Sequence, residues 1–129
     1  MASMLKLVTL LLLSCSVVLA SWPSCNCASV QYSGADVEAA IVQGNKTNPS
    51  PVFGGRGYPH RFGNREGVKL PYCDSKEYVE YPLKQGRAYT GGPPGADRVI
   101  YSTKNAFCGC ITHTGAAQRN GFVACDVKQ

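Results

Sequence analysis

Apolar residues follow three different patterns along this chain, and each pattern predicts a different kind of segment. Residues 7–19 form an almost continuous apolar run near the start of the chain. Residues 33–44 then place apolar side chains at helical spacing, and the second half carries short apolar stretches between glycine- and proline-rich turns. The sequence therefore predicts a leader, one helix and a set of short strands, in that order.

The first 20 residues are typical of a secretory signal peptide. Lys6 supplies the positive start, the apolar run follows, and Val18-Leu19-Ala20 provides a cleavage site before Ser21. The alternative is a membrane anchor, but the run is short for a bilayer span and nothing later in the chain is apolar enough to span. We expect residues 1–20 to be removed and residues 21–129 to be secreted as one domain, without membrane association.

Residues 33–44 predict the one clear helix of the secreted chain. Its apolar stripe falls at positions i, i+3 and i+4, occupied by Val37, Ala40 and Ile41. Ser33 can cap the start of this helix, and Asp36 suits the positive end of the helix dipole. Gly44 is a candidate for the residue that ends it.

The second half of the chain predicts short strands at residues 76–83, 98–102, 107–113 and 121–125. Residues 91–95 are rich in glycine and proline, but they do not form a phosphate-binding P-loop, because no Gly-Lys-Ser/Thr follows. The expected fold class is therefore α+β, with one α-helix packed on a twisted antiparallel β-sheet in a single domain.

Residues 58–67 predict a short strand that runs into a tight turn. Side chains alternate between the faces of a strand, so Tyr58, His60 and Phe62 should point the same way. Glycines then flank a turn that holds Glu66, whose carboxylate could accept two parallel hydrogen bonds, as the edge of guanine would offer. A surface loop with a solvated glutamate would show the same local pattern.

Three further polar side chains can reach one face of the predicted sheet. Glu80 lies between apolar neighbours that should face the opposite way, while Arg98 and His113 occupy strand ends. Each of them alone has an ordinary structural explanation, such as an ion pair between Arg98 and a neighbouring acid. The chain has only two histidines, and finding both with a glutamate and an arginine on one possible face favours a catalytic site.

These groups are sufficient to cleave RNA without a metal or another cofactor. The 2′-hydroxyl must lose a proton as it attacks phosphorus, and the departing 5′-oxygen must gain one, which requires a general base and a general acid. A fixed cation would stabilise the negative charge that develops on the phosphoryl oxygens. The need for a 2′-hydroxyl excludes DNA as a substrate.

Six of the seven cysteines remain after the leader is removed, and an even number in a small secreted domain indicates disulfides. Spacing alone leaves 15 possible pairings. A zinc site fits the cysteine spacing less well than disulfides do, because structural zinc prefers wider Cys-x2-Cys spacing than the Cys-x-Cys pairs present here. The formal charge of +5 falls by one with Lys6, and this positive balance favours contact with a polyanion such as RNA.

Several separated motifs occur in an order that resembles the fungal secreted guanyl-specific ribonucleases, the T-type members of the microbial ribonuclease group. The motifs are Tyr58-Pro59-His60, the strand around Glu80, Gly95-Ala96-Asp97-Arg98, Ile111-Thr112-His113-Thr114-Gly115 and Asn120-Gly121-Phe122. This resemblance covers nearly all of residues 21–129 and implies a microbial ribonuclease domain that cleaves single-stranded RNA after guanosine. It also implies that the helix continues through Gly44 and stops before Pro49.

The resemblance also implies a role for each residue of the site. Glu80 would be the base, His113 the acid and Arg98 the cation. His60 would assist or replace the base, Tyr58 would donate a hydrogen bond to phosphate, and Phe122 would form a dry wall. In the guanine site, Glu66 would bind the base edge, Asn64 with the loop backbone would contact O6 and N7, Phe62 would stack, and Asn120 would close the far side.

Three positions of the guanine loop depart from the commonest family pattern. Phe62 replaces a tyrosine, Gly63 an asparagine and Arg65 a lid tyrosine, so these departures affect guanine selection and leave the catalytic residues unchanged. For the disulfides, the resemblance implies Cys27 with Cys125 and Cys73 with Cys108, which leaves Cys25 with Cys110.

Three other functions share part of this pattern. A ribotoxin-like effector would carry long basic loops, whereas the loops here are short. An RNA-binding module on the same fold would lack the catalytic His or Glu, and a disulfide-stapled structural domain would not explain the His/Glu/Arg set. We therefore expect a monomeric secreted endoribonuclease that forms a 2′,3′-cyclic phosphate.

Overall fold

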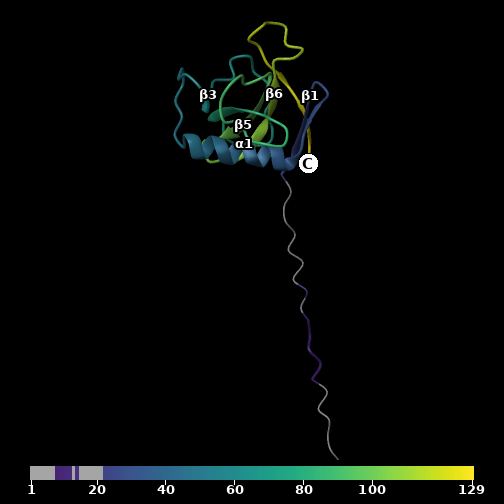
Figure 1. Cartoon of the computed structure of the whole chain (residues 1–129). Helices are drawn as coiled ribbons and strands as arrows, with labels where there is room; N and C mark the ends of the chain where they lie inside the picture. Colours follow the sequence, from purple (N-terminus) through teal and green to yellow (C-terminus); the bar gives the residue numbers. More distant parts are fainter. Residues whose placement is uncertain (1–7, 13, 15–21) are drawn as a thin grey trace, which may run out of the picture.

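The computed structural model describes residues 8–12, 14 and 22–129, and its folded part is an α+β domain (Figure 1). The predicted signal-peptide cleavage after Ala20 lies outside the described residues. No helix in the described part of the chain is both long and apolar enough to cross a membrane. One helix packs on antiparallel sheet, which confirms the predicted fold class.

The single helix of the described chain, α1, spans Gly34–Thr47. Ser33 and Asp36 form a capping box, in which each side chain accepts the other's backbone N–H, at 3.1 and 3.0 Å. The helix continues past Gly44 and ends at Thr47, with Asn48 as its C-cap before Pro49, as the resemblance implied. Its buried face carries Val37, Ala40, Ile41 and Gly44.

The strands form two sheets rather than the single sheet that the sequence predicted. A five-stranded sheet has the order β3-β4-β5-β6-β7, and a three-stranded sheet has the order β2-β1-β8, with all neighbours antiparallel. The strand bounds are Ser24–Cys27 (β1), Val30–Tyr32 (β2), His60–Phe62 (β3), Tyr78–Pro82 (β4), Asp97–Ser102 (β5), Phe107–Thr112 (β6), Val123–Ala124 (β7) and Asp126–Lys128 (β8).

The small sheet corrects the sequence-based prediction at both ends of the domain. The hairpin β1–β2 was not predicted, because its two-residue turn is Ala28-Ser29, which lacks the usual Asn-Gly signal although both residues have positive φ, 49° and 74°. The predicted strand at 121–125 is wrong in its extent. It is reduced to β7, and the chain then leaves the large sheet so that β8 can pair with β1.

The two faces of the large sheet have different partners. Alternate residues of β4 and β5, such as Val79, Tyr81, Val99 and Tyr101, pack in the cluster that includes the helix residues Val37 and Ile41. Ile100 and Ile111 point to the opposite face, where they pack with Leu70 and Cys108. Because side chains alternate, Glu80 and Arg98 share that second face. The helix thus supports the sheet from one side and leaves the other side for the site.

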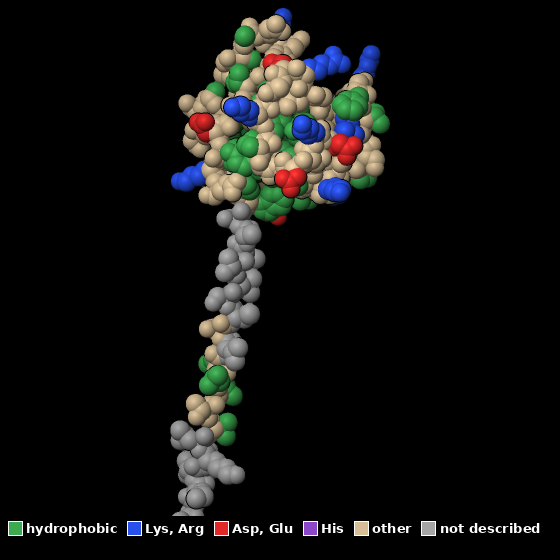
Figure 2. Space-filling model, turned by 180° about the vertical axis from the view of Figure 1, so that it is seen from behind, with side chains coloured by type: hydrophobic (Ala, Val, Ile, Leu, Met, Phe, Trp, Pro, Cys, Tyr) green, Lys and Arg blue, Asp and Glu red, His purple; other side chains and the backbone are tan. Residues whose placement is uncertain are grey.

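Three disulfides join these layers, in the pairs that the resemblance implied. They are Cys25–Cys110, Cys27–Cys125 and Cys73–Cys108. The first two connect β1 to β6 and to the residue after β7, so the small sheet is fixed to the large one. The surface behind the view of Figure 1 carries scattered Lys and Arg side chains with acidic ones between them (Figure 2).

Candidate active site

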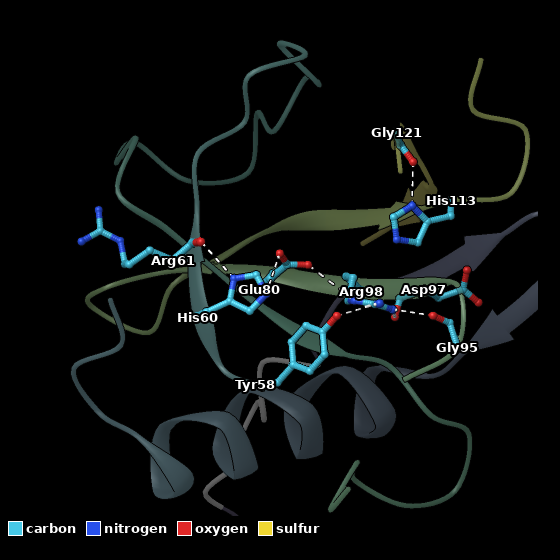
Figure 3. A network of polar contacts seen from close by, with 9 residues as sticks. All are labelled: Tyr58, His60, Arg61, Glu80, Gly95, Asp97, Arg98, His113 and Gly121. Carbon is cyan, nitrogen blue, oxygen red and sulfur yellow. Dashed lines mark hydrogen bonds and ion pairs between the residues drawn. The ribbon is translucent and has the colours of Figure 1, made fainter. Parts of the chain in front are cut away.

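Strand pairing brings three predicted catalytic side chains together on the exposed face of the large sheet. His60 in β3 is directly opposite Glu80 in β4, and the next strand, β5, begins with Asp97 and Arg98. His60 Nε2 lies 3.1 Å from Glu80 Oε1, and Arg98 Nε lies 3.5 Å from Glu80 Oε2. The carboxylate is therefore held between a histidine and an arginine from its neighbouring strands (Figure 3).

Glu80 and Arg98 are both buried, with 6% and 2% of their surface exposed. Burial raises the pKa of the Glu80 carboxyl above its ordinary value of 4.5, and the positive charges of His60, Arg98 and His113 oppose this rise. The carboxylate thus keeps its proton more readily than an ordinary glutamate does. A base of this kind is closer in proton affinity to the working pH of an enzyme.

The Arg98 guanidinium is fixed by neutral oxygen atoms on the side away from Glu80. One terminal nitrogen donates to the carbonyl oxygens of Gly95 and Asp97, at 2.9 and 3.0 Å, and the other donates to the Tyr58 hydroxyl at 3.0 Å. The guanidinium carbon also lies 5.0 Å from the centre of the Tyr58 ring. These contacts hold a permanent positive charge and a phenol side by side on the sheet face.

His113 approaches from the other side of the site. It follows the end of β6, and in Figure 3 it lies across the Glu80 carboxylate from His60. Its Nδ1 is 2.7 Å from the Gly121 carbonyl oxygen, and because a carbonyl can only accept, Nδ1 carries a proton. Its ring stacks on Phe122 with centroids 3.8 Å apart. Nε2 is left as the atom that can transfer a proton.

The six residues predicted to bind guanine line one cavity of about 450 Å³, together with His60 and Phe122. These six are Phe62, Gly63, Asn64, Arg65, Glu66 and Asn120. The Phe62 ring meets Phe122 edge-on at 5.8 Å, which links the base loop to the segment that holds His113. The catalytic cluster and the predicted base site are therefore continuous.

Two polar side chains of the base loop are already occupied by backbone groups. The Asn64 amide donates to the Val68 carbonyl at 2.9 Å and accepts from the Val68 N–H at 2.8 Å, so this side chain holds the turn. Asn64 itself has a positive φ of 48°. Contacts from Asn64 to a base must therefore come from its backbone unless the turn opens.

Glu66 makes the second backbone contact. Both of its carboxylate oxygens lie 3.1 Å from the Phe122 N–H. An ionised carboxylate has further lone pairs, so it can still accept hydrogen bonds from a ligand. No ion pair between Glu66 and Arg65 occurs in the described structure. Glu66 thus connects the base loop to the residue that stacks on His113.

Several groups that orient the site could not have been found in the sequence. The Gly95, Asp97, Gly121 and Arg61 carbonyl oxygens position Arg98, His113 and His60, the last through a contact of 3.1 Å. Every residue has a carbonyl group, so no residue type signals this role. Only the folded backbone reveals it.

Comparisons with known proteins identify the family of this chain. The model of the ribonuclease family matches residues 20–126. Guanyl-specific ribonuclease U1 of Ustilago sphaerogena is 48% identical over 105 residues, covering 79% of this chain and 94% of that protein. Guanyl-specific ribonuclease T1 of Aspergillus oryzae is 42% identical over 101 residues, covering 77% and 75%.

A solved structure shows the same architecture. A ribonuclease from Hericium erinaceus, RNase He1, superimposes with a TM-score of 0.58 at 41% identity, covering 80% of this chain and 98% of that one. The relationship inferred from separated motifs is confirmed by these matches. The chain belongs to the ribonuclease family.

Proposed function

We propose that this protein is a secreted guanyl-preferring endoribonuclease that cleaves single-stranded RNA on the 3′ side of guanosine. The observation that carries the proposal is the buried Glu80, held between His60 and Arg98, with His113 across from it and stacked on Phe122, which lines the predicted base cavity. The guanyl-specific relatives favour this function over an effector or an RNA-binding module.

The reaction is a transfer of the phosphoryl group within the RNA strand. Glu80 takes the proton of the guanosine 2′-hydroxyl, and the 2′-oxygen attacks phosphorus. The bond from phosphorus to the 5′-oxygen of the next nucleoside breaks, and His113 Nε2 gives that oxygen a proton. The products are a 2′,3′-cyclic phosphate and a free 5′-hydroxyl, and water later opens the cycle to a 3′-phosphate.

Arg98 and Tyr58 stabilise the charge that develops on the phosphoryl oxygens. Their contacts hold them in place before substrate arrives, so little reorganisation is needed as the charge forms. His60 supports the base, because both of its ring nitrogens face acceptors, the Arg61 carbonyl and Glu80. One proton can therefore be shared between His60 and Glu80, and His60 can take over as the base.

Guanine would bind in the cavity between the base loop and Phe122. Glu66 would accept from the ring N1–H and the exocyclic amine, Phe62 would stack, and Asn120 would close the far side. Arg65 and Gly63 line the same cavity, at positions where the resemblance implies a tyrosine and an asparagine. We expect a genuine preference for guanine that is less strict than is usual in the family.

The proposed reaction needs no metal ion or cofactor. Within residues 8–12, 14 and 22–129, no three His, Cys, Asp or Glu side chains come together as a metal site would require. The roles above are filled by Glu80, His113 and Arg98, with support from His60 and Tyr58. Activity in excess EDTA is therefore part of the proposal.

The test is digestion of a defined single-stranded RNA in excess EDTA, with the ends of every product mapped. Cuts after G that leave 2′,3′-cyclic phosphate are expected. The same RNA with 2′-deoxyguanosine at one G should resist cleavage there, because the nucleophile is missing. Loss of activity on chelation, with recovery on adding zinc or magnesium, would contradict the assigned chemistry.

We also propose that the protein is secreted and is a monomer. One relative, from Gibberella baccata, is named an extracellular guanyl-specific ribonuclease. The exported protein should begin at Ser21 by mass spectrometry and elute as a monomer in size-exclusion chromatography. A product that retains residues 1–20 would contradict the predicted signal peptide.

A further inference from the structure

The base cavity extends beyond the residues assigned to guanine and catalysis. Part of its wall is made by Phe53, Gly54, Gly55 and Arg61. The first three belong to the loop that precedes Tyr58, and Arg61 lies in the edge strand β3. None of the roles described above uses the side chains of these residues.

Phe53 is an exposed aromatic residue, and contacts with Arg61 hold its loop in place. Its exposed fraction is 62%, which is high for a large apolar side chain in a small domain. The Arg61 guanidinium lies 4.7 Å from the ring centre, and its Nε donates to the Tyr78 carbonyl at 3.2 Å. The Arg61 N–H also donates to the Val52 carbonyl at 3.0 Å. The loop is thus pinned to β3 beside its own aromatic residue.

The space next to this ring is open because Gly63 has no side chain. A Cβ at Gly63 would lie 3.9 Å from Phe53 Cε1 and 3.9 Å from Arg65 Cγ, so it would project between them. Glycine also occupies positions 54 and 55 of the wall. The space beside Phe53 is therefore not filled by side chains at these three positions of the wall.

The charges around this wall suit a phosphate backbone. Arg61 and Arg65 both line the cavity, and the one acidic residue of the lining, Glu66, is directed to the Phe122 N–H. An aromatic platform flanked by arginines is the usual way in which proteins hold a single-stranded nucleotide. The ligand chemistry indicated is therefore a base with its adjoining phosphate.

The direction of the RNA strand follows from the reaction. The attacking 2′-oxygen belongs to guanosine and lies by His60 and Glu80, whereas the leaving 5′-oxygen belongs to the next nucleoside and lies by His113. Phe53 and Arg61 are at the β3 edge, on the His60 side, and β6 with His113 lies three strands away. The nucleotide that can reach Phe53 is therefore the one joined to the 5′-oxygen of guanosine.

We propose that Phe53 and Arg61 form a binding site for the nucleotide on the 5′ side of the cleaved guanosine. This inference rests on the proposed ribonuclease function. The Phe53 ring stacks on the base, and Arg61 and Arg65 attract the phosphate that precedes guanosine. Because stacking uses the face common to all bases, the site tolerates any base.

The experiment compares kcat/KM for GpC, pGpC, ApGpC and GpCpA. ApGpC should be cleaved about five- to tenfold faster than GpC, since stacking on an exposed aromatic falls at the lower end of its usual range. GpCpA, extended on the 3′ side, should lack this gain. A gain seen only with GpCpA would overturn the assigned direction, and a full gain with pGpC would overturn the stacking role of Phe53.

Variants of Phe53 test whether its ring causes the faster cleavage of ApGpC. Phe53→Ala should abolish the ApGpC gain and leave GpC cleavage unchanged, whereas Phe53→Tyr should keep the gain. Val52→Ala is the matched control, because Val52 is equally exposed, at 66%, but does not line the cavity. Failure of the wild type to cleave GpC would refute the proposed function, whereas cleavage of GpC with no gain from a 5′ nucleotide would refute this site alone.

Discussion

Glu80 shows how a single side chain combines burial with reactivity. Acidic residues are seldom buried unless they are paired, and this one is 6% exposed between His60 and Arg98. Burial raises the pKa of its carboxyl, which makes it a stronger base than a solvated glutamate. The same burial therefore predicts the pH dependence of the reaction.

The acid side of the pH profile should reflect the raised pKa of Glu80. The base acts when ionised, so kcat/KM falls as pH falls through this pKa, and the inflection is expected above 4.5. The measurement is kcat/KM for GpC across acid pH. Glu66→Gln, which removes the carboxylate of the base loop, should leave the inflection in place. An inflection at or below 4.5 would show that Glu80 is not the base.

Proton transfer should depend more on His113 than on Glu80. His113→Ala is expected to lower kcat by roughly 10²–10⁴, the usual contribution of a positioned acid. Glu80→Ala should lose less, because His60 lies 3.1 Å from the carboxylate and can replace it. Steady-state kinetics on GpC measures both losses, and the exposed neighbour variant Thr114→Ala is the control. Near-normal turnover by His113→Ala would exclude the mechanism.

Base selection should depend on Glu66. Adenine presents an acceptor where guanine presents N1–H, and a bidentate match is worth about 1–3 kcal/mol of discrimination. Glu66→Gln should therefore lower the ratio of GpC to ApC cleavage by about tenfold or more. The ratio cancels any loss that comes through the Phe122 contact. Glu38→Gln on the helix is the control, and an unchanged ratio in Glu66→Gln would mean that this loop does not read the base.

At the scale of elements, the helix packs tightly against the sheet at Gly44. A Cβ there would lie 2.5 Å from the Tyr101 hydroxyl and 3.2 Å from two ring atoms of Tyr81. Tyr101 is 2% exposed, and its hydroxyl has no hydrogen-bond partner in the described structure. Glycine is kept inside a helix here because the packing leaves no room for a side chain.

Gly44→Ala should therefore destabilise the domain despite the better helix propensity of alanine. The propensity gain is about 1 kcal/mol, and overpacking costs about 1–3 kcal/mol, so a net loss near 1 kcal/mol is expected in urea unfolding. Adding Tyr101→Phe to the Gly44→Ala variant should restore stability, because it removes the hydroxyl that the new side chain would contact. Val42→Ala, at a position 57% exposed, should be neutral or slightly stabilising. Stabilisation by Gly44→Ala alone would contradict this packing.

At the scale of the whole molecule, two disulfides link the same two parts of the chain, the strand β1 and the C-terminal segment. Cys25–Cys110 and Cys27–Cys125 have sequence separations of 85 and 98. While either bridge is intact, the other closes a path of only about 17 residues, worth about 3 kcal/mol on the chain-entropy model. In a variant that lacks one of these bridges, the remaining bridge closes a much longer loop.

The two bridges should consequently be non-additive. Replacing both pairs by alanine should cost about 1 kcal/mol more than the sum of the two single-pair losses, measured as the free energy of unfolding in urea. The Cys73–Cys108 pair, with its separation of 35, is the control and should add independently to either. Additive losses for the first two pairs would argue against this entropic coupling.

Local patterns in the sequence determined the elements that carry the site. The helix was predicted because its stripe and its Ser33 cap are encoded within one stretch, and β4, β5 and β6 were predicted because their alternation is also local. The hairpin β1–β2 was missed because its backbone is held by partners at the far end of the chain, while its Ala-Ser turn carries no signal.

The sequence by itself determined which chemical groups are present and on which face of each strand they fall, because alternation along a strand depends only on neighbouring residues. Tertiary structure decided which of 15 cysteine pairings form, how far Glu80 is buried, and that Glu66 binds the Phe122 N–H. Those properties depend on distances between segments far apart in the chain. They arise only when packing of the sheet on α1 brings the segments together.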